Sequence, residues 1–170
     1  GIYASLNCGP GSGHAIDAVM ANRANVTVAL GQKPQSLATC YQLHSADVVT
    51  VTAPWSWKDA PQADAMVTNA PNIALGILTA DCLPISFADG RNRVIAAAHA
   101  GWKGALGGVI ENTLAAMEKL GASKASIAAA IGPGIAQASY EVGGEFRERF
   151  LEQSPQNARY FIPSRRGGHH

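Results

Sequence analysis

The chain has 170 residues, of which 47% are hydrophobic and 15% charged, and this composition is typical of one folded domain rather than a disordered segment. Its formal net charge of +1 and the lack of a basic cluster argue against nucleic acid or an anionic membrane as the main partner. No apolar run approaches the roughly 20 residues that span a bilayer.

Three cysteines, Cys8, Cys40 and Cys82, cannot all pair with one another, and no stretch resembles a secretory leader. A reducing, cytoplasmic location is therefore expected. The chain opens at Gly1 without an initiator methionine and closes on GGHH, as a fragment of a longer protein does.

The N-terminal part predicts a loop followed by a helix. Residues 1–14 are rich in Gly, Ser and Asn, which is typical of a surface loop or of one that approaches a ligand. Residues 17–30 have near-helical apolar spacing and end before Gly31, which predicts an amphipathic helix. Arg23 lies on this helix, where an arginine is usually solvated.

Two short strands are predicted next. Residues 37–43 and 47–54 have strand character, and His44 lies between them. A histidine in such a place is more often satisfied or exposed than a metal ligand. Residues 55–71 are rich in turn-forming Pro and Asp and predict a connection.

The middle of the chain predicts two buried strands, each followed by a reactive side chain. Residues 72–80 and 94–98 are apolar runs separated by a turn, and they are expected to form a hairpin or a neighbouring pair. Cys82 and His99 follow these runs. Both side chains should therefore emerge at one edge of a sheet.

Helical spacing and a terminal glycine predict one helix over residues 102–120, which begins just after His99. The amide groups at its start are candidates to hold an anion beside the reactive pair. Residues 126–131 predict another buried strand, 132–145 a glycine-rich turn, and 146–153 a further helix.

The residues Cys82, His99 and His44 admit three interpretations. One cysteine and two histidines can hold zinc and leave a fourth position for water or substrate. A cysteine and a histidine can also form a nucleophilic dyad, and a cysteine after an apolar run can simply be buried. Asp81 weakens the last interpretation, because a carboxylate next to Cys82 is costly to bury unless it is paired. The carboxylate of Asp81 can also orient a ligating histidine.

Several short segments together make the chain similar to the YfiH-like family, also described as laccase-domain or polyphenol oxidase proteins. These segments are YASLN, the NR pair of the first helix, QLHSADV, LTADCLPI, AAAHAGWKG and IGPGIAQASYEVGGE. The resemblance covers residues 1–165. It implies a single α+β domain over residues 1–170, with packed mixed β-sheets flanked by helices, that lacks N-terminal and C-terminal segments found in relatives.

The resemblance also implies a site. Its zinc ligands fall on His44, Cys82 and His99, and its nucleoside-pocket motifs fall on Asn7 and Arg23. The implied activity is phosphorolysis of adenosine, inosine, guanosine and methylthioadenosine with phosphate, and deamination of adenosine as a second activity. In this scheme Arg23 is a candidate to hold phosphate, and Asp81 to transfer a proton or orient its neighbours.

Three other functions compete with this one. Within the family, the rivals are a hydrolase that edits a peptidoglycan precursor and a copper-dependent polyphenol oxidase, because cysteine and imidazole also suit copper. Only five histidines occur in the chain, which argues against a multi-copper site. A non-enzymatic binding module is the third rival, and it predicts a fourth protein ligand that closes the metal site.

Overall fold

A computed structural model describes residues 5–164 and 168–170 of the chain. The first four residues of the predicted N-terminal loop lie outside the described residues. Contacts divide the chain into two compact units, Gly1–Gly132 and Pro133–His170. Each unit is described by itself.

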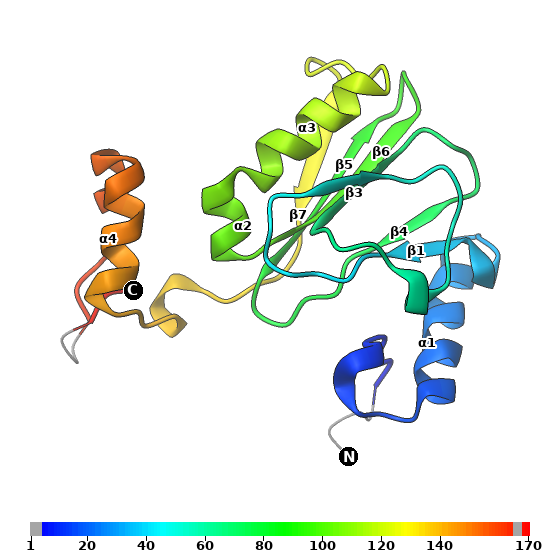
Figure 1. The fold of residues 1–170 in the computed structure, drawn as a ribbon, viewed down its shortest axis with the longest axis horizontal. Helices are drawn as coiled ribbons and strands as arrows, with labels where there is room; N and C mark the ends of the chain where they lie inside the picture. The colour runs from blue at the N-terminus through cyan, green and yellow to red at the C-terminus, as the bar shows by residue number, and fades with distance from the viewer. Residues whose placement is uncertain (1–4, 165–167) are drawn as a thin grey trace. The chain divides into compact units, whose positions relative to one another are not determined.

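The described part of the first unit contains two sheets (Figure 1). The larger has five strands in the order β2-β3-β6-β5-β7, with β2 and β3 parallel and the other pairs antiparallel. The smaller is a parallel pair of β1 and β4. The strands are β1 (Leu37–Thr39), β2 (Val48–Thr50), β3 (Ala65–Thr68), β4 (Ala74–Gly76), β5 (Leu83–Asp89), β6 (Val94–Ala100) and β7 (Ile127–Ile131).

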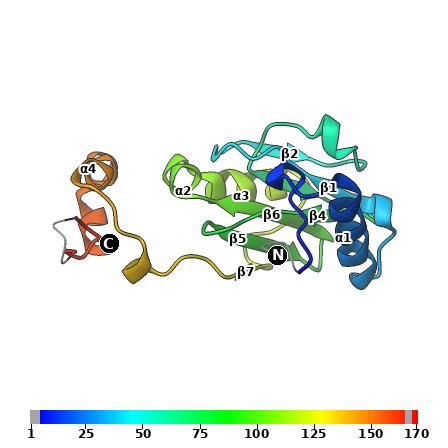
Figure 2. The same ribbon diagram turned by 90° about the horizontal axis from the view of Figure 1, so that it is seen from below.

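The described residues of this unit form the α-helices α1 (Ile16–Ala29), α2 (Trp102–Gly107) and α3 (Val109–Lys119). Helix α3 covers one face of the larger sheet, as Figures 1 and 2 show. Its fully buried Val109 and Met117 belong to the same core as Val67 and Ala98 of the sheet. Among the described residues, no helix combines the length and hydrophobicity that crossing a lipid bilayer requires. The predicted α+β fold with mixed sheets and helices is confirmed.

The predicted helix over residues 102–120 is divided into α2 and α3. Gly108 separates the two helices with a φ of 89°, a left-handed conformation that glycine adopts without steric cost. The apolar residues keep their helical spacing from α2 into α3, so the sequence pattern does not reveal this break. The predicted helix over residues 17–30 is confirmed, because α1 differs from it by one residue at each end.

The predicted pairing in the middle of the chain is partly wrong. Only Ala74–Gly76 of residues 72–80 form a strand, and that strand pairs with β1 in the smaller sheet. The hairpin partner of β6 is β5, which the apolar runs did not predict because Pro84 and Ser86 interrupt its apolar character. In β5 buried side chains alternate with more exposed ones, as in a strand with one face on the core.

The other strands also differ from prediction. The strands expected over residues 37–43 and 47–54 shorten to β1 and β2. Strand β7 lies where residues 126–131 predicted it, but Ala128 to Ile131 are exposed rather than buried. It lies at the end of the strand order, so it has a neighbouring strand on one side only.

The second unit contains α4 (Gly144–Gln153), which confirms the predicted helix over residues 146–153. Phe146, Phe150 and Phe161 pack together, with ring centroids 5.0 to 6.2 Å apart. The backbone of Val142 exchanges hydrogen bonds with that of His169.

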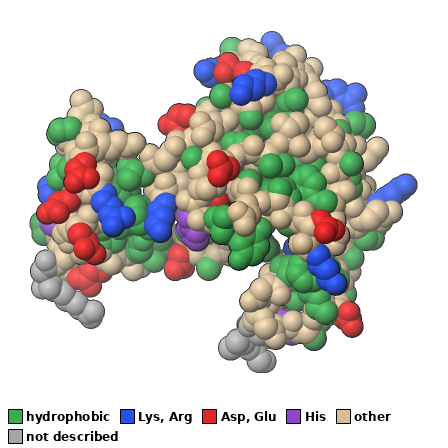
Figure 3. All heavy atoms as spheres, in the orientation of Figure 1, with side chains coloured by type: hydrophobic (Ala, Val, Ile, Leu, Met, Phe, Trp, Pro, Cys, Tyr) green, Lys and Arg blue, Asp and Glu red, His purple; other side chains and the backbone are tan. Residues whose placement is uncertain are grey.

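On the face drawn in Figure 3, acidic and basic side chains are scattered among uncharged ones.

Candidate metal centre

Three side chains that the sequence singles out lie together in the first unit. His44 lies between β1 and β2, Cys82 directly precedes β5, and His99 is the penultimate residue of β6. Their ligand atoms all lie within 4.8 Å of one another. The Sγ atom of Cys82 lies 3.7 Å from the Nε2 atom of His44. Their role as metal ligands stays a prediction.

The antiparallel hairpin of β5 and β6 explains why Cys82 and His99 meet. Pro84 pairs with His99, and Leu83 pairs with Ala100, so the start of β5 lies beside the end of β6. The expectation that each side chain follows a strand end is wrong in detail. Cys82 precedes a strand, and His99 lies inside one.

The carboxylate that contacts this cluster is Asp64, which the sequence patterns did not single out. Its Oδ1 atom lies 2.7 Å from the Nδ1 atom of His99. Burial raises the pKa of Asp64, but hydrogen bonds from His99, Ser45 and Leu43 outweigh burial and hold that pKa below its usual value. Asp81, the carboxylate expected to orient a histidine, is exposed.

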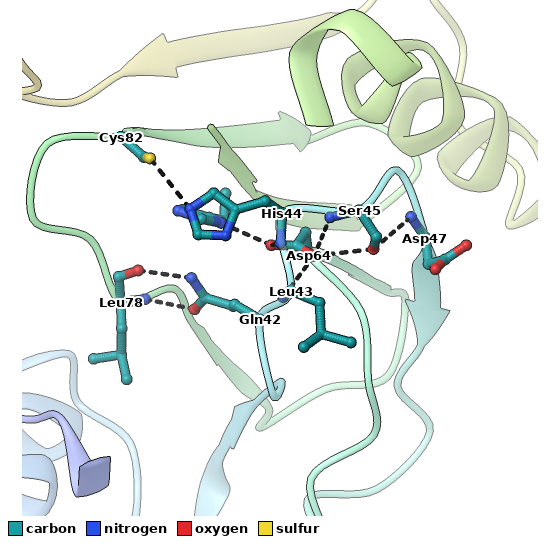
Figure 4. A network of polar contacts seen from close by, with 9 residues as sticks. Gln42, Leu43, His44, Ser45, Asp47, Asp64, Leu78 and Cys82 are labelled. Carbon is teal, nitrogen blue, oxygen red and sulfur yellow. Dashed lines mark hydrogen bonds and ion pairs between the residues drawn. The ribbon is translucent and has the colours of Figure 1, made fainter. Parts of the chain in front are cut away.

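Asp64 also holds the loop that carries His44. It accepts hydrogen bonds from three consecutive backbone N–H groups, those of Leu43, His44 and Ser45, at 2.7 to 3.0 Å. Next to them, the side chain of Gln42 both donates to and accepts from the backbone of Leu78. Figure 4 shows these contacts side by side. They tie the segment before His44 to the segment that leads to Cys82.

Gly101 leaves room for the cluster. A Cβ atom at this position would lie 2.5 Å from the Cδ2 atom of His44 and 3.1 Å from the Sγ atom of Cys82. A Cβ at Gly104, in α2, would lie 2.7 Å from the carbonyl oxygen of Ser45. The two glycines therefore let α2 and its preceding turn approach the His44 loop closely.

The geometry of the cluster fits zinc. Zinc bonds of about 2.0 Å to imidazole and about 2.3 Å to thiolate, at tetrahedral angles, place a nitrogen and a sulfur ligand about 3.5 Å apart. The distance from Cys82 Sγ to His44 Nε2 is 3.7 Å. The Nδ1 atom of His99 is engaged by Asp64, so its Nε2 atom is the one available to a metal. The three ligand atoms lie within 4.8 Å of one another, so they would have to move closer together to bind zinc at these bond lengths.

The environment of the Cys82 thiol disfavours the nucleophilic dyad. Burial and the nearby carboxylates of Asp81 and Asp64 raise the pKa of Cys82. A cysteine nucleophile instead needs surroundings that lower its pKa and favour the thiolate. A cysteine that binds a metal must also be a thiolate, and a bound cation would itself favour that form.

Arg23 is buried rather than solvated. It lies between Val19 and Thr27 on the buried side of α1 and donates hydrogen bonds to Thr39 Oγ1 at 2.7 Å and to the Cys8 carbonyl oxygen at 3.3 Å. It lines a cavity of about 520 Å³ whose wall also includes two tryptophans, at positions 55 and 57. None of the three residues of the cluster lines this cavity.

Asn7 lies in the loop before α1. Its side chain donates to Ser12 Oγ at 2.7 Å and accepts from the backbone of Gly9 at 3.1 Å. Asn22 of α1 donates to the Asn7 carbonyl oxygen at 2.8 Å. These bonds fix the loop against the helix, and the substrate contacts expected of Asn7 and Arg23 stay predictions.

Comparison with known proteins places this chain in a family. The family model described as multi-copper polyphenol oxidoreductase laccase matches residues 1–170. The chain belongs to this laccase-domain, YfiH-like family. The resemblance seen in the short sequence segments is thereby confirmed.

Members of the YfiH-like family with curated names include purine nucleoside phosphorylases. One from Streptomyces coelicolor is 41% identical over 153 residues, which cover 90% of this chain and 63% of that protein. The one named YfiH in Escherichia coli is 37% identical over 161 residues, covering 94% of this chain and 63% of that protein. The chain spans 57% to 63% of the length of three such relatives.

Solved structures of the YfiH-like family share the fold. A protein of Neisseria meningitidis is 36% identical and superimposes with a TM-score of 0.86 over 99% of this chain and 66% of its own. The protein YlmD of Geobacillus stearothermophilus is 26% identical, with a TM-score of 0.88 over 99% of this chain and 66% of its own.

Proposed function

We propose that this chain carries the zinc centre of a purine nucleoside phosphorylase. The proposed substrates are phosphate with adenosine, inosine, guanosine or methylthioadenosine, and deamination of adenosine is the proposed second activity. The observation that carries the proposal is the convergence of His44, Cys82 and His99 within 4.8 Å. The names of the curated relatives support the choice of reaction. We also propose that residues 1–170 form one domain, and that the longer relatives add further segments to it.

In the proposed site, a few side chains have separate roles. His44, Cys82 and His99 hold the metal, and bound zinc supplies Lewis acidity at the coordination position that three protein ligands leave free. Among the described residues the cluster contains three such side chains, which favours an open catalytic site over a binding module closed by a fourth ligand. Asp81, exposed beside Cys82, is the proposed group for proton transfer.

Phosphorolysis requires a bound phosphate. A phosphate oxygen attacks the anomeric carbon of the ribose, and the bond from that carbon to the purine nitrogen breaks. We assign phosphate binding to Arg23, because its buried guanidinium forms no ion pair with a carboxylate among the described residues. Asn7 is the proposed contact to the nucleoside. We also place the protein in the cytoplasm, where its three free cysteines stay reduced.

Copper-dependent oxidation of phenols is the second candidate, and the description of the matching family favours it. One thiolate and two imidazoles also suit copper. The metal content of protein purified without added metal decides between the two. Predominant zinc supports the phosphorylase, and predominant copper with phenol oxidation supports the oxidase. Hydrolysis of a peptidoglycan precursor, without phosphate-dependent release of base, would instead support the editing hydrolase.

Replacing the sulfur ligand tests the proposal. We expect Cys82→Ala to lose its zinc and the phosphate-dependent release of hypoxanthine from inosine, because two imidazoles alone hold zinc weakly. Cys8→Ala is the control, since Cys8 lies outside the cluster, and it should retain zinc. Full turnover by metal-free Cys82→Ala would overturn the scheme.

A further inference from the structure

We propose that Asp64 is a positioning residue that holds both imidazole ligands of the proposed centre in their binding geometry. The inference rests on the proposed function for the metal itself. The hydrogen bonds that carry it belong to the protein alone. They explain how a loop and a strand that lie 55 residues apart in sequence present two histidines to one point.

Asp64 is a buried anion, and its two carboxylate oxygens accept hydrogen bonds from different groups. Its side chain is fully buried, and a buried carboxylate is costly unless its oxygens are hydrogen bonded. Oδ1 accepts from the ring of His99 at 2.7 Å and from the backbone of His44 at 2.9 Å. Oδ2 accepts from the backbone of Leu43 at 3.0 Å and from the backbone and hydroxyl of Ser45 at 2.7 and 2.9 Å.

Oδ1 sets the tautomer of His99. An ionised carboxylate only accepts hydrogen bonds, so the Nδ1 atom of His99 must carry the proton. The lone pair of the neutral ring then lies on Nε2, the atom left for the metal. The backbone N–H of His99 also donates to the carbonyl oxygen of Asp64 at 2.7 Å. Asp64 thus fixes both the main chain and the ring of this ligand.

Oδ2 holds the loop that presents His44. This loop is tightly turned, since His44 has a φ of 63°, a left-handed conformation that few residues other than glycine adopt. The amides on either side of His44 donate to Oδ2 and keep the turn closed. The ring of His44 consequently meets the ring of His99 edge-on, with centroids 4.8 Å apart and planes at 73°.

The substitution Asp64→Asn exposes this double role, because an amide keeps one accepting oxygen and replaces the other with an NH2 group. An NH2 group in the Oδ1 position faces the Nδ1 atom of His99, which must then accept, so the ring proton moves to Nε2 and blocks the metal. An NH2 group in the Oδ2 position faces two backbone N–H groups, so the loop of His44 must move. Either orientation impairs one imidazole ligand.

Zinc affinity of the folded chain tests the proposal, measured by competition with a chromophoric chelator. Asp89→Asn is a matched control, because Asp89 is also fully buried, also accepts from backbone and side-chain donors, and lies at the opposite end of β5 from Cys82. We expect Asp64→Asn to weaken zinc binding about 10- to 100-fold. Asp89→Asn should stay within about twofold of the unsubstituted chain, because distant sites act independently.

A folded Asp64→Asn chain that binds zinc as tightly as Asp89→Asn would overturn the proposal. A second measurement does not depend on the variant folding. Heteronuclear NMR of the unsubstituted, metal-free chain at alkaline pH should find the ring proton of His99 on Nδ1, and a proton on Nε2 would also overturn the proposal. An unsubstituted chain that binds no zinc would refute the proposed function instead, while the tautomer still decides the role of Asp64.

Discussion

Gly101 shows how a single residue limits the proposed centre. Its φ of −73° is open to any residue, so its backbone conformation does not require glycine. The restriction is steric, because a Cβ at this position meets the ring of His44 and the sulfur of Cys82. Both contacts involve side chains whose positions the proposed metal site needs.

We therefore expect Gly101→Ala to fold but to bind zinc about tenfold more weakly or worse, since the added methyl group displaces a ligand. The zinc dissociation constant measures the effect. Gly107→Ala is the matched control, because a Cβ there lies 3.5 Å from the Cβ of Ala46, an ordinary contact. Equal zinc affinities for the two variants would show that Gly101 has no special role.

At the scale of elements, Asp89 joins the end of β5 to two other segments. Its carboxylate accepts hydrogen bonds from Arg91 and Asn92 in the turn before β6. It also accepts from Ser123 and Ser126, which lie between α3 and β7. One buried side chain thus closes the hairpin and anchors the approach to the edge strand.

This network predicts a pH dependence of stability. Hydrogen bonds from the side chain of Asn92 and the backbone of Ser123 hold the pKa of Asp89 well below its usual range. The native state therefore binds fewer protons than the unfolded state, in which the pKa of an aspartate is about 3.9. The stabilisation from Asp89 is fully present above that pKa and is lost as the pH falls toward the lower, native value.

We expect Asp89→Asn to lower Tm by several degrees at neutral pH, because buried donors lose an accepting oxygen. The difference in Tm between the variant and the unsubstituted chain should shrink as the pH falls below about 4. Thermal unfolding across a pH series measures both effects. A constant difference in Tm down to strongly acidic pH would contradict the assignment.

At the scale of the whole molecule, the proposed ligands come from three separate parts of the first unit. His44 precedes β2, Cys82 precedes β5, and His99 lies in β6. A metal bound by all three joins segments that are distant in the chain. Binding to the native state alone adds its free energy to that of folding.

Zinc should therefore stabilise the chain against unfolding. At a free zinc concentration about 100 times the dissociation constant, the free energy of unfolding should rise by about 2.7 kcal/mol. Urea titrations with and without zinc measure this rise, and a chelator should reverse it. Zinc that leaves the titration of the unsubstituted chain unchanged would count against a native-state metal site.

The sequence predicted the elements with strong local periodicity and the residues that converge. Residues 17–30 formed the expected helix, and His44, Cys82 and His99 met as the resemblance implied. Strand β5 is not predicted because Pro84, its second residue, weakens the strand signal.

The sequence does not predict the role of Asp64, for a different reason. It lies in a turn-rich stretch, and its partners His44 and His99 lie 20 and 35 residues away in the chain. Asp81, adjacent to Cys82, was the obvious carboxylate by proximity in sequence. The one available signal was that Asp64 directly precedes the buried residues of β3, where an unpaired carboxylate would be costly.

The position of His99 in β6 limits where insertions and deletions can occur in proteins of this family. Side chains of a strand alternate between its faces, and Val94, Ala96, Ala98 and Ala100 belong to the core beneath α3. His99 therefore faces the opposite side. Deleting one residue upstream within β6 would turn the imidazole into that core. Insertions and deletions that lineages tolerate should accordingly accumulate in the connecting loops and spare this strand.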